Sequence, residues 1–246
     1  AASDVYKRQS EHSAIYQALK AGRRDEVSKF VLTASGGPFR DRNDLDSVTV
    51  EEALAHPTWN MGPVVTINSA TLVNKGLEII EAHYLFDIPY EKIEAVIHPQ
   101  SVIHSMVEFV DGSTIAQASP PNMKGPIAYA LSEGRRVHGA MTSIDWSQSS
   151  TWNFAPIDEV RFPAIRVARE VGVKGGGFTA IFNAANEVAV DAYLKGSIKF
   201  SHIVKSIEAV LSKFSNQSPF QIRDLADVSA IENDARAYSA QLIKGV

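Results

Sequence analysis

The sequence contains no cysteine, so it can form neither disulfide bonds nor a thiolate metal site. Any metal ion must therefore be held by oxygen atoms or imidazole. The chain also lacks an excess of one charge, with 24 basic and 28 acidic residues and a formal net charge of -4. Such a balance gives no basic field that would gather nucleic acid or an anionic membrane, and we expect neither as a partner.

Long apolar runs are absent as well. No uninterrupted stretch approaches the roughly 18 residues that a membrane span needs, and the N-terminus lacks the apolar core of a signal peptide. We therefore expect a soluble protein. The spacing Gly-x-Gly-x-x-Gly is also missing, because Gly36-Gly37 and Gly175–Gly177 do not match it. The sequence thus predicts no nucleotide site of its own.

What is present suits one large domain or two modest ones: 246 residues, of which 45% are hydrophobic. The patterns predict the α/β fold class, with a mixed-sheet catalytic domain followed by a C-terminal helical bundle domain. We place a foreign or truncated end at residues 1–9, the catalytic domain at 10–132, a linker at 133–160 and the helical domain at 161–246.

Short β-branched and aromatic runs predict strands at 29–33, 64–67, 95–97, 102–110 and 113–117. Asp111-Gly112 predicts a hairpin between the last two strands. Periodic apolar residues predict helices at 10–19 (with Ser10 as N-cap), 50–54, 72–86, 164–171, 179–195, 201–213 and 229–243. In helix 72–86 the expected buried stripe is Val73, Leu77, Ile80 and Tyr84, and the expected polar face is Asn74, Glu78 and Glu81.

One group of polar residues suggests a phosphate site. Ser69, Asn74 and Lys75 stand at the expected start of helix 72–86, and a loop Ser35-Gly36-Gly37 follows the first strand. A helix N-terminus presents unpaired amides, which hydroxyl, amide and ammonium donors can supplement around an anion. Taken singly, Ser69 reads as a helix cap and Lys75 as a solvated side chain. As a set, they predict a phosphorylated small molecule as ligand.

A second group consists of carboxylates. Glu11, Glu78 and Glu81 would suit Mg2+ or Mn2+, which prefer oxygen ligands, although spacing alone favours a solvated helix face. Among the histidines His56, His98 and His104, no spacing matches a zinc motif, and the last two read equally well as satisfied strand histidines. The non-periodic segment 56–62 combines Pro and Gly with bulky side chains, which is typical of a mobile lid.

Five motifs in order resemble one family, 1-deoxy-D-xylulose 5-phosphate reductoisomerase. They begin at Ser10, Ala34, His56, Ser69 and Ile97, reading Ser-Glu-His-Ser-Ala, Ala-Ser-Gly-Gly-Pro-Phe-Arg, His-Pro-Thr-Trp-Asn-Met-Gly, Ser-Ala-Thr-Leu-Val-Asn-Lys-Gly-Leu-Glu and Ile-His-Pro-Gln-Ser-Val-Ile-His-Ser-Met-Val. The likeness resumes at 162–164 and 183–187. It implies a metal- and NADPH-dependent enzyme that rearranges and reduces its ketose phosphate to 2-C-methyl-D-erythritol 4-phosphate, for isoprenoid precursors. Bacterial cytoplasm or plastid stroma would be its compartment, and a homodimer its assembly.

The resemblance also implies roles for individual residues. Glu11 and Glu78 would bind Mg2+ or Mn2+, and Lys75, His56 and Glu78 would be the catalytic groups. The phosphate and the rest of the substrate would meet Ser10, Ser35, His56, Trp59, Met61, Ser69, Asn74, Lys75, Ser101, His104, Pro121 and Met123, with Glu81 in the pocket wall. Gly62 and Met123 would be contacts of the lid or pocket near the cofactor.

The sequence departs from the family pattern in two respects. Nothing before Ser10 corresponds to the family's NADPH-binding domain, so the chain reads as a fragment without turnover of its own. Gln9 stands where the family has a metal-binding aspartate, and a neutral amide is a poorer ligand for a hard dication. Two other readings stay open: a non-redox, aldolase-like module that binds metal and phosphate, and a non-catalytic dimerisation fragment.

Overall fold

The computed structural model describes residues 9–215 and 220–245, so the predicted foreign end lies outside the described residues except for Gln9. Two compact units make up the chain, and each is discontinuous in sequence. The first, here called the sheet unit, comprises the chain up to Gly36 and Glu81–Ile157. The second, the helical unit, comprises Gly37–Ile80 and the chain from Asp158 onward. The predicted domain division at 132 and 160 stays a prediction.

The sheet unit is built on four strands in the order β2-β1-β3-β4. Strand β1 pairs in parallel with β2 and antiparallel with β3, and β3 pairs antiparallel with β4. The sheet is therefore mixed, as the sequence predicted. The hairpin between β3 and β4 is confirmed, with Gly112 at φ 83°. The strands are β1 (Val27–Ala34), β2 (Ile93–Ile97), β3 (Ile103–Phe109) and β4 (Thr114–Ala118).

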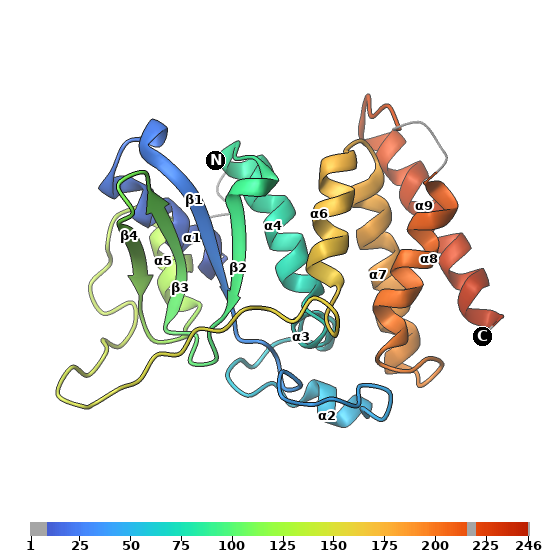
Figure 1. The fold of residues 1–246 in the computed structure, drawn as a ribbon, viewed down its shortest axis with the longest axis horizontal. Coiled ribbons are helices and arrows are strands. Elements are labelled where there is room, and N and C mark those ends of the chain that lie inside the picture. The colour runs from blue at the N-terminus through green and yellow to red at the C-terminus, as the bar shows by residue number, and fades with distance from the viewer. Residues whose placement is uncertain (1–8, 216–219, 246) are drawn as a thin grey trace. The chain divides into compact units, whose positions relative to one another are not determined.

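Helices cover one face of this sheet. Helix α1 (Ser10–Ala18) contacts β3, β4 and α5 (Lys124–Leu131), and Figure 1 shows both helices behind the strands. The core beneath them is apolar, with Ile15, Phe30 and Leu32 almost fully buried. Short 3-10 turns complete the unit at η2 (Leu19–Ala21), η3 (Arg24–Glu26) and η4 (Tyr90–Lys92).

The helical unit buries its own core between long amphipathic helices. Helix α7 contacts α6, α8, α9 and α3, and Phe178, Ile181 and Phe182 of α7 are almost fully buried. The expected C-terminal helical bundle is thus present (Figure 1). The helices are α2 (Val50–Leu54), α3 (Pro63–Ala70), α6 (Ala164–Lys174), α7 (Phe178–Leu194), α8 (His202–Phe214) and α9 (Leu225–Lys244). No described helix is long and apolar enough to span a bilayer.

The predicted strand at 64–67 is wrong, because these residues belong to α3. Pro63 occupies the first helical position, where its fixed φ and missing amide hydrogen are tolerated, and Thr66 Oγ1 donates to Gly62 O at 2.9 Å. The β-branched run Val64-Val65 favoured a strand locally. Yet both side chains are exposed while Ile67 is buried, which is the periodicity of a helix.

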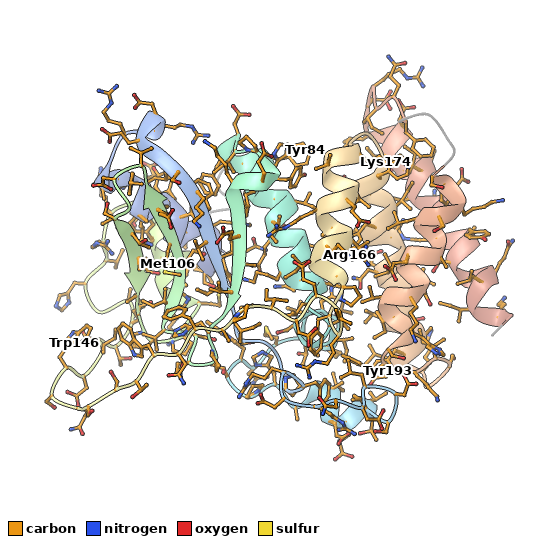
Figure 2. The ribbon with its side chains drawn as sticks, viewed as in Figure 1. Tyr84, Met106, Trp146, Arg166, Lys174 and Tyr193 are labelled. Atoms are coloured by element: carbon orange, nitrogen blue, oxygen red, sulfur yellow. The ribbon has the colours of Figure 1, made fainter. Side chains whose placement is uncertain are left out.

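Two further expectations about helices are corrected. Helix α4 (Val73–Phe86) confirms the predicted helix, but only Thr71 and Leu72, the latter at φ 62°, separate it from α3. Ser69 therefore lies in the last turn of α3 and does not cap α4. The N-cap of α1 is Gln9, not Ser10. Tyr84 is 61% exposed at the end of α4 and does not belong to a buried stripe (Figure 2). The boundary between the two units falls within α4, after Ile80.

Candidate functional site

In the helical unit, the His56 side chain organises the start of the predicted lid. Its Nδ1 accepts hydrogen bonds from the backbone amides of Thr58 (3.1 Å) and Trp59 (2.9 Å), and its Nε2 lies 3.1 Å from Ser69 Oγ. Because amides can only donate, the ring proton of neutral His56 is on Nε2 and is donated to Ser69. The predicted residues His56, Trp59 and Ser69 are thus brought together through one imidazole.

The end of α3 approaches the chain at Gly37 closely. A Cβ atom at Gly37 would lie 2.9 Å from Ala70 Cα and 3.2 Å from Ser69 O, and Gly37 has φ 62°. Only glycine meets both demands, since it has no side chain and accepts a left-handed backbone. The predicted ligand-binding loop at Gly36-Gly37 therefore also allows its own backbone to pack closely against the backbone of Ser69 and Ala70.

A buried ionic cluster occupies the first turns of α4. Lys75 Nζ and Asn74 Nδ2 both donate to the Glu78 carboxylate, one to each oxygen. The Lys75 and Glu78 side chains are only 4% and 3% exposed. The reading of Lys75 as a solvated side chain is therefore wrong, and so is that of Glu78 on a solvated face. Two charges buried three residues apart on one helix are costly unless each compensates the other, as they do here.

In the sheet unit, α1 begins with two predicted site residues, Ser10 and Glu11, and Gln9 is its N-cap. Ser10 Oγ donates to Glu11 Oε2 at 2.6 Å, and Ser10 is buried. Gln9 Oε1 is buried with no hydrogen-bond partner among the described residues. The next residue, His12, is fully buried, and its Nδ1 lies 3.5 Å from Glu81 Oε2, so the structure brings Glu81 to α1. A buried amide oxygen of this kind can accept a hydrogen bond or coordinate a cation.

A second set in the sheet unit surrounds the start of β3. Ser101, at φ 52°, is 8% exposed, and His104 is 4% exposed with Nε2 3.1 Å from both Ser119 O and Ser119 Oγ. Thr33 Oγ1 contacts the carbonyls of Ile103 (2.6 Å) and His104 (2.9 Å). His104 is thus a satisfied strand histidine, as one reading of the sequence expected. Ser35 directly follows β1, two residues after Thr33.

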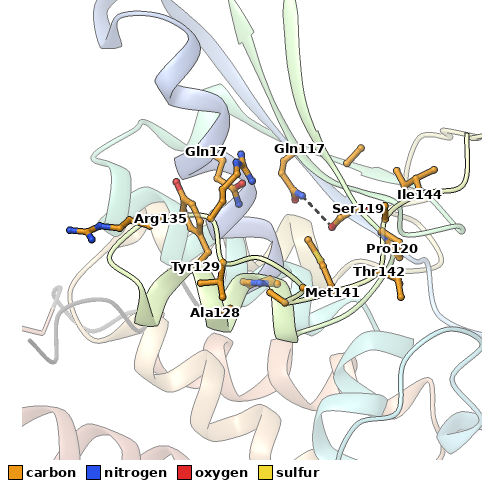
Figure 3. Close-up of a pocket in the computed structure, with 18 of the residues that line it drawn as sticks. Gln17, Gln117, Ser119, Pro120, Ala128, Tyr129, Arg135, Met141, Thr142 and Ile144 are labelled. Carbon is orange, nitrogen blue, oxygen red and sulfur yellow. Dashed lines mark hydrogen bonds between the residues drawn. The ribbon is translucent and has the colours of Figure 1, made fainter.

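The segment that carries Pro121 and Met123 continues from Ser119 into α5. Pro121 is half-buried and Met123 is 37% exposed. A cavity of about 360 Å³ lies beside this segment, between β4, α5 and residues 135–146. Figure 3 shows side chains that line it. Neither Pro121 nor Met123 lines it, so this cavity is distinct from the predicted pocket wall. Trp146, which also borders it, is 74% exposed on the long loop (Figure 2).

The described residues contain no group of three or more histidine, aspartate and glutamate side chains that could hold a metal ion.

The sequence patterns gave no indication of Arg161, whose side chain fixes the backbone of the loop after Gly37 by hydrogen bonds. Its guanidinium donates to the carbonyls of Arg40 and Arg42, each at 2.9 Å, and to Asp158 at 2.8 Å. These contacts join residues about 120 positions apart, so no local pattern could have indicated them.

Burial lowers the pKa of His56 below its ordinary value of 6.5. Because the unfolded state then binds more protons, we expect the free energy of unfolding to fall as the pH drops below about 6.5 and to level off below the folded-state pKa. Urea unfolding at pH 7.5 and 5.5 measures this change. His56→Gln should reduce the loss on acidification, and an unchanged pH dependence in that variant would contradict the expectation.

The fold and these clusters define an α/β protein with a helical bundle, whose predicted site residues are hydroxyl, imidazole and buried ionic groups. Two family models match the chain: "1-deoxy-D-xylulose 5-phosphate reductoisomerase C-terminal domain" at residues 5–86 and "DXP reductoisomerase C-terminal domain" at residues 118–238. The chain belongs to the 1-deoxy-D-xylulose 5-phosphate reductoisomerase family.

Similar proteins agree with this assignment. The reductoisomerase of Kitasatospora griseola is 56% identical over 96% of the chain and 62% of its own length. A solved Zymomonas mobilis reductoisomerase in complex with NADPH has a TM-score of 0.89 at 43% identity, over 97% of this chain and 62% of that one. A reductoisomerase solved with NADPH, fosmidomycin and magnesium has a TM-score of 0.88 at 36% identity, over 96% and 62%. The chain thus spans about six tenths of the length of these relatives.

Proposed function

We propose that this chain supplies the substrate- and metal-binding part of an enzyme that converts 1-deoxy-D-xylulose 5-phosphate into 2-C-methyl-D-erythritol 4-phosphate. The observation that carries the proposal is the buried cluster of Lys75, Glu78 and Asn74. A protein that only needed stability would gain little from burying this ion pair, since apolar side chains of similar volume often do as well or better. A site that binds an anion and a cation needs both charges.

The phosphate end of the substrate is assigned to Ser35, Ser69, Asn74 and Lys75. Lys75 contributes the positive charge, while the hydroxyl and amide groups contribute directed hydrogen bonds. Ser69 already receives a hydrogen bond from His56, so its own hydroxyl hydrogen is left to donate to a phosphate oxygen. Ser10 is assigned to the substrate next to the metal.

The divalent metal is assigned to Glu11 and Glu78, whose carboxylate oxygens suit Mg2+ or Mn2+. The buried Oε1 of Gln9 fits the same group, because an amide oxygen can coordinate a hard cation, although it brings no charge. When bound, the metal would act as a Lewis acid on the substrate carbonyl and its neighbouring hydroxyl. Glu78 would hold its charge beside Lys75, which balances the carboxylate before any cation arrives.

The lid is assigned to His56, Trp59, Met61 and Gly62. Closure of this segment would exclude water and strengthen the electrostatic interactions of the catalytic groups Lys75, His56 and Glu78. His56 would remain neutral and would orient Ser69 through its Nε2 proton. The wall of the pocket is assigned to Glu81, Ser101, His104, Pro121 and Met123.

NADPH, which the solved relatives bind, has no matching fingerprint in this sequence, because neither glycine cluster has the spacing of a dinucleotide-binding turn. The cofactor is therefore assigned to no residue here, beyond Gly62 and Met123 as contacts of the lid or pocket. By the family resemblance we also propose a homodimer, and a bacterial cytoplasm or plastid stroma as the compartment. Strand β4, at the edge of the described sheet and largely exposed, offers backbone groups for pairing.

Calorimetric titration with fosmidomycin and Mn2+ tests the proposal on the chain itself. We expect fosmidomycin binding to depend on the metal and the parent chain to bind Mn2+ weakly. The Gln9→Asp variant should bind Mn2+ roughly tenfold more tightly or better, because the new carboxylate adds a full negative charge to the site. Lys92→Asp, which adds a carboxylate at an exposed position of η4, should leave Mn2+ affinity unchanged. Absence of metal-dependent binding in both the parent and Gln9→Asp would refute the proposed function.

A further inference from the structure

His98, which directly follows β2, has its side chain fully buried and both ring nitrogens engaged. Nδ1 lies 2.9 Å from Asn153 O, and Nε2 lies 3.1 Å from the backbone nitrogens of both Val102 and Ile103. A carbonyl can only accept and an amide can only donate, so the ring is neutral, with its proton on Nδ1. The contacts of His98 therefore determine one tautomer.

The imidazole shapes the loop that leads into β3. Two consecutive amides, those of Val102 and Ile103, converge on Nε2, and Ser101 N donates to His98 O at 3.0 Å. Ser101 adopts φ 52°, a conformation that few residues other than glycine take unless their surroundings impose it. The ring and the backbone of His98 together supply the contacts that hold Ser101 there.

Residues 153–155 contact the Nδ1 edge and one face of the ring and pair with the end of β2. Phe154 stacks on the imidazole with ring centroids 4.6 Å apart and planes 12° apart. Ala155 and Ile97 exchange two backbone hydrogen bonds of 2.9 and 3.0 Å. His98 thus joins the start of β3 to a segment 55 residues away.

The same loop is connected to His104. Val102 O accepts a hydrogen bond from Ser119 N at 2.9 Å, and both oxygens of Ser119 lie 3.1 Å from His104 Nε2. A displacement of Val102 would therefore move the hydrogen-bond partner of His104 as well as Ser101. Both of these residues belong to the pocket wall assigned above.

We propose that His98 is a positioning residue for the substrate-binding wall: its Nδ1-protonated imidazole fixes Ser101 and His104 in the arrangement that receives the ligand. The inference rests on the proposed function, since that function gives Ser101 and His104 their role. His98 itself does not touch the ligand, because none of its side chain is exposed. It acts through the backbone of residues 101–103.

The test compares His98→Ala and His98→Gln with Ile93→Val, which removes a methyl group from a fully buried residue at the other end of β2. Each variant is titrated with fosmidomycin and Mg2+ by calorimetry, and its thermal unfolding midpoint is recorded. We expect His98→Ala to bind roughly 10- to 100-fold more weakly, as misplaced binding groups do. His98→Gln should recover part of this loss, because its amide oxygen can accept from Val102 and Ile103. Ile93→Val should lower the midpoint and leave affinity unchanged.

Nitrogen-15 NMR of the histidine rings supplies a readout that does not depend on the ligand, with the expected signal being a protonated Nδ1 and an unprotonated Nε2 for His98. A proton on Nε2 would overturn the inference directly. If the parent binds fosmidomycin and His98→Ala binds it as tightly as Ile93→Val does, His98 is only structural. If the parent shows no binding at all, the proposed function fails, and the positioning role fails with it.

Discussion

Lys75→Ala is expected to lower the free energy of unfolding by about 3–5 kcal/mol, because it leaves a buried carboxylate without its counter-ion. Glu78, only 3% exposed, would keep Asn74 as a donor but lose the ammonium group that balances its charge. Binding of fosmidomycin should weaken in addition by roughly 10- to 100-fold, the value of a hydrogen bond to a charged group. Urea unfolding and calorimetric titration measure the two effects.

Lys92→Ala is the matched control, since Lys92 is exposed and outside the proposed site. A second variant, Lys75→Met with Glu78→Gln, removes both charges and should recover most of the lost stability while leaving ligand and metal binding impaired. This combination separates folding from function. Equal losses of ligand affinity in Lys75→Ala and Lys92→Ala would contradict the phosphate assignment.

Gly37→Ala should cost about 2–5 kcal/mol of unfolding free energy, the sum of two effects. A residue with a side chain in the left-handed region costs about 1–2 kcal/mol, and overpacking costs about 1–3 kcal/mol. The new Cβ would lie 2.9 Å from Ala70 Cα, a backbone atom that cannot swing aside. Since Ala70 follows Ser69, the strain should also disturb the proposed phosphate contact.

Gly112→Ala isolates the first of these effects. Gly112 has φ 83°, but an added Cβ there would meet nothing within 4 Å, so we expect only the conformational cost of about 1–2 kcal/mol. Chemical denaturation of both variants gives the comparison. Identical losses at Gly37 and Gly112 would show that the approach of Ala70 is easily relieved.

The sequence by itself determined the features that depend on short-range patterns. Runs of β-branched residues predicted β1, β2 and β3, and Asp111-Gly112 predicted the hairpin between β3 and β4, because turn chemistry and strand propensity are local properties. Motif order from Ser10 to Val107 predicted the family, which the comparisons confirmed. The same motifs also supplied the candidate site residues, whose roles in binding and catalysis stay predictions. The absence of cysteine excluded thiolate chemistry on composition alone.

Only the tertiary structure decided which residues are buried and what they contact. Val64-Val65 read locally as a strand, yet the segment is a helix because it begins at Pro63 and buries Ile67 on one side. The sequence alone suggested that Lys75 is a solvated cation, but it is buried in an ion pair with Glu78. His98 finds its partner 55 residues away. Periodicity along the chain reports the local backbone, whereas burial and pairing depend on groups that the fold brings from distant positions, and these set the chemistry proposed here.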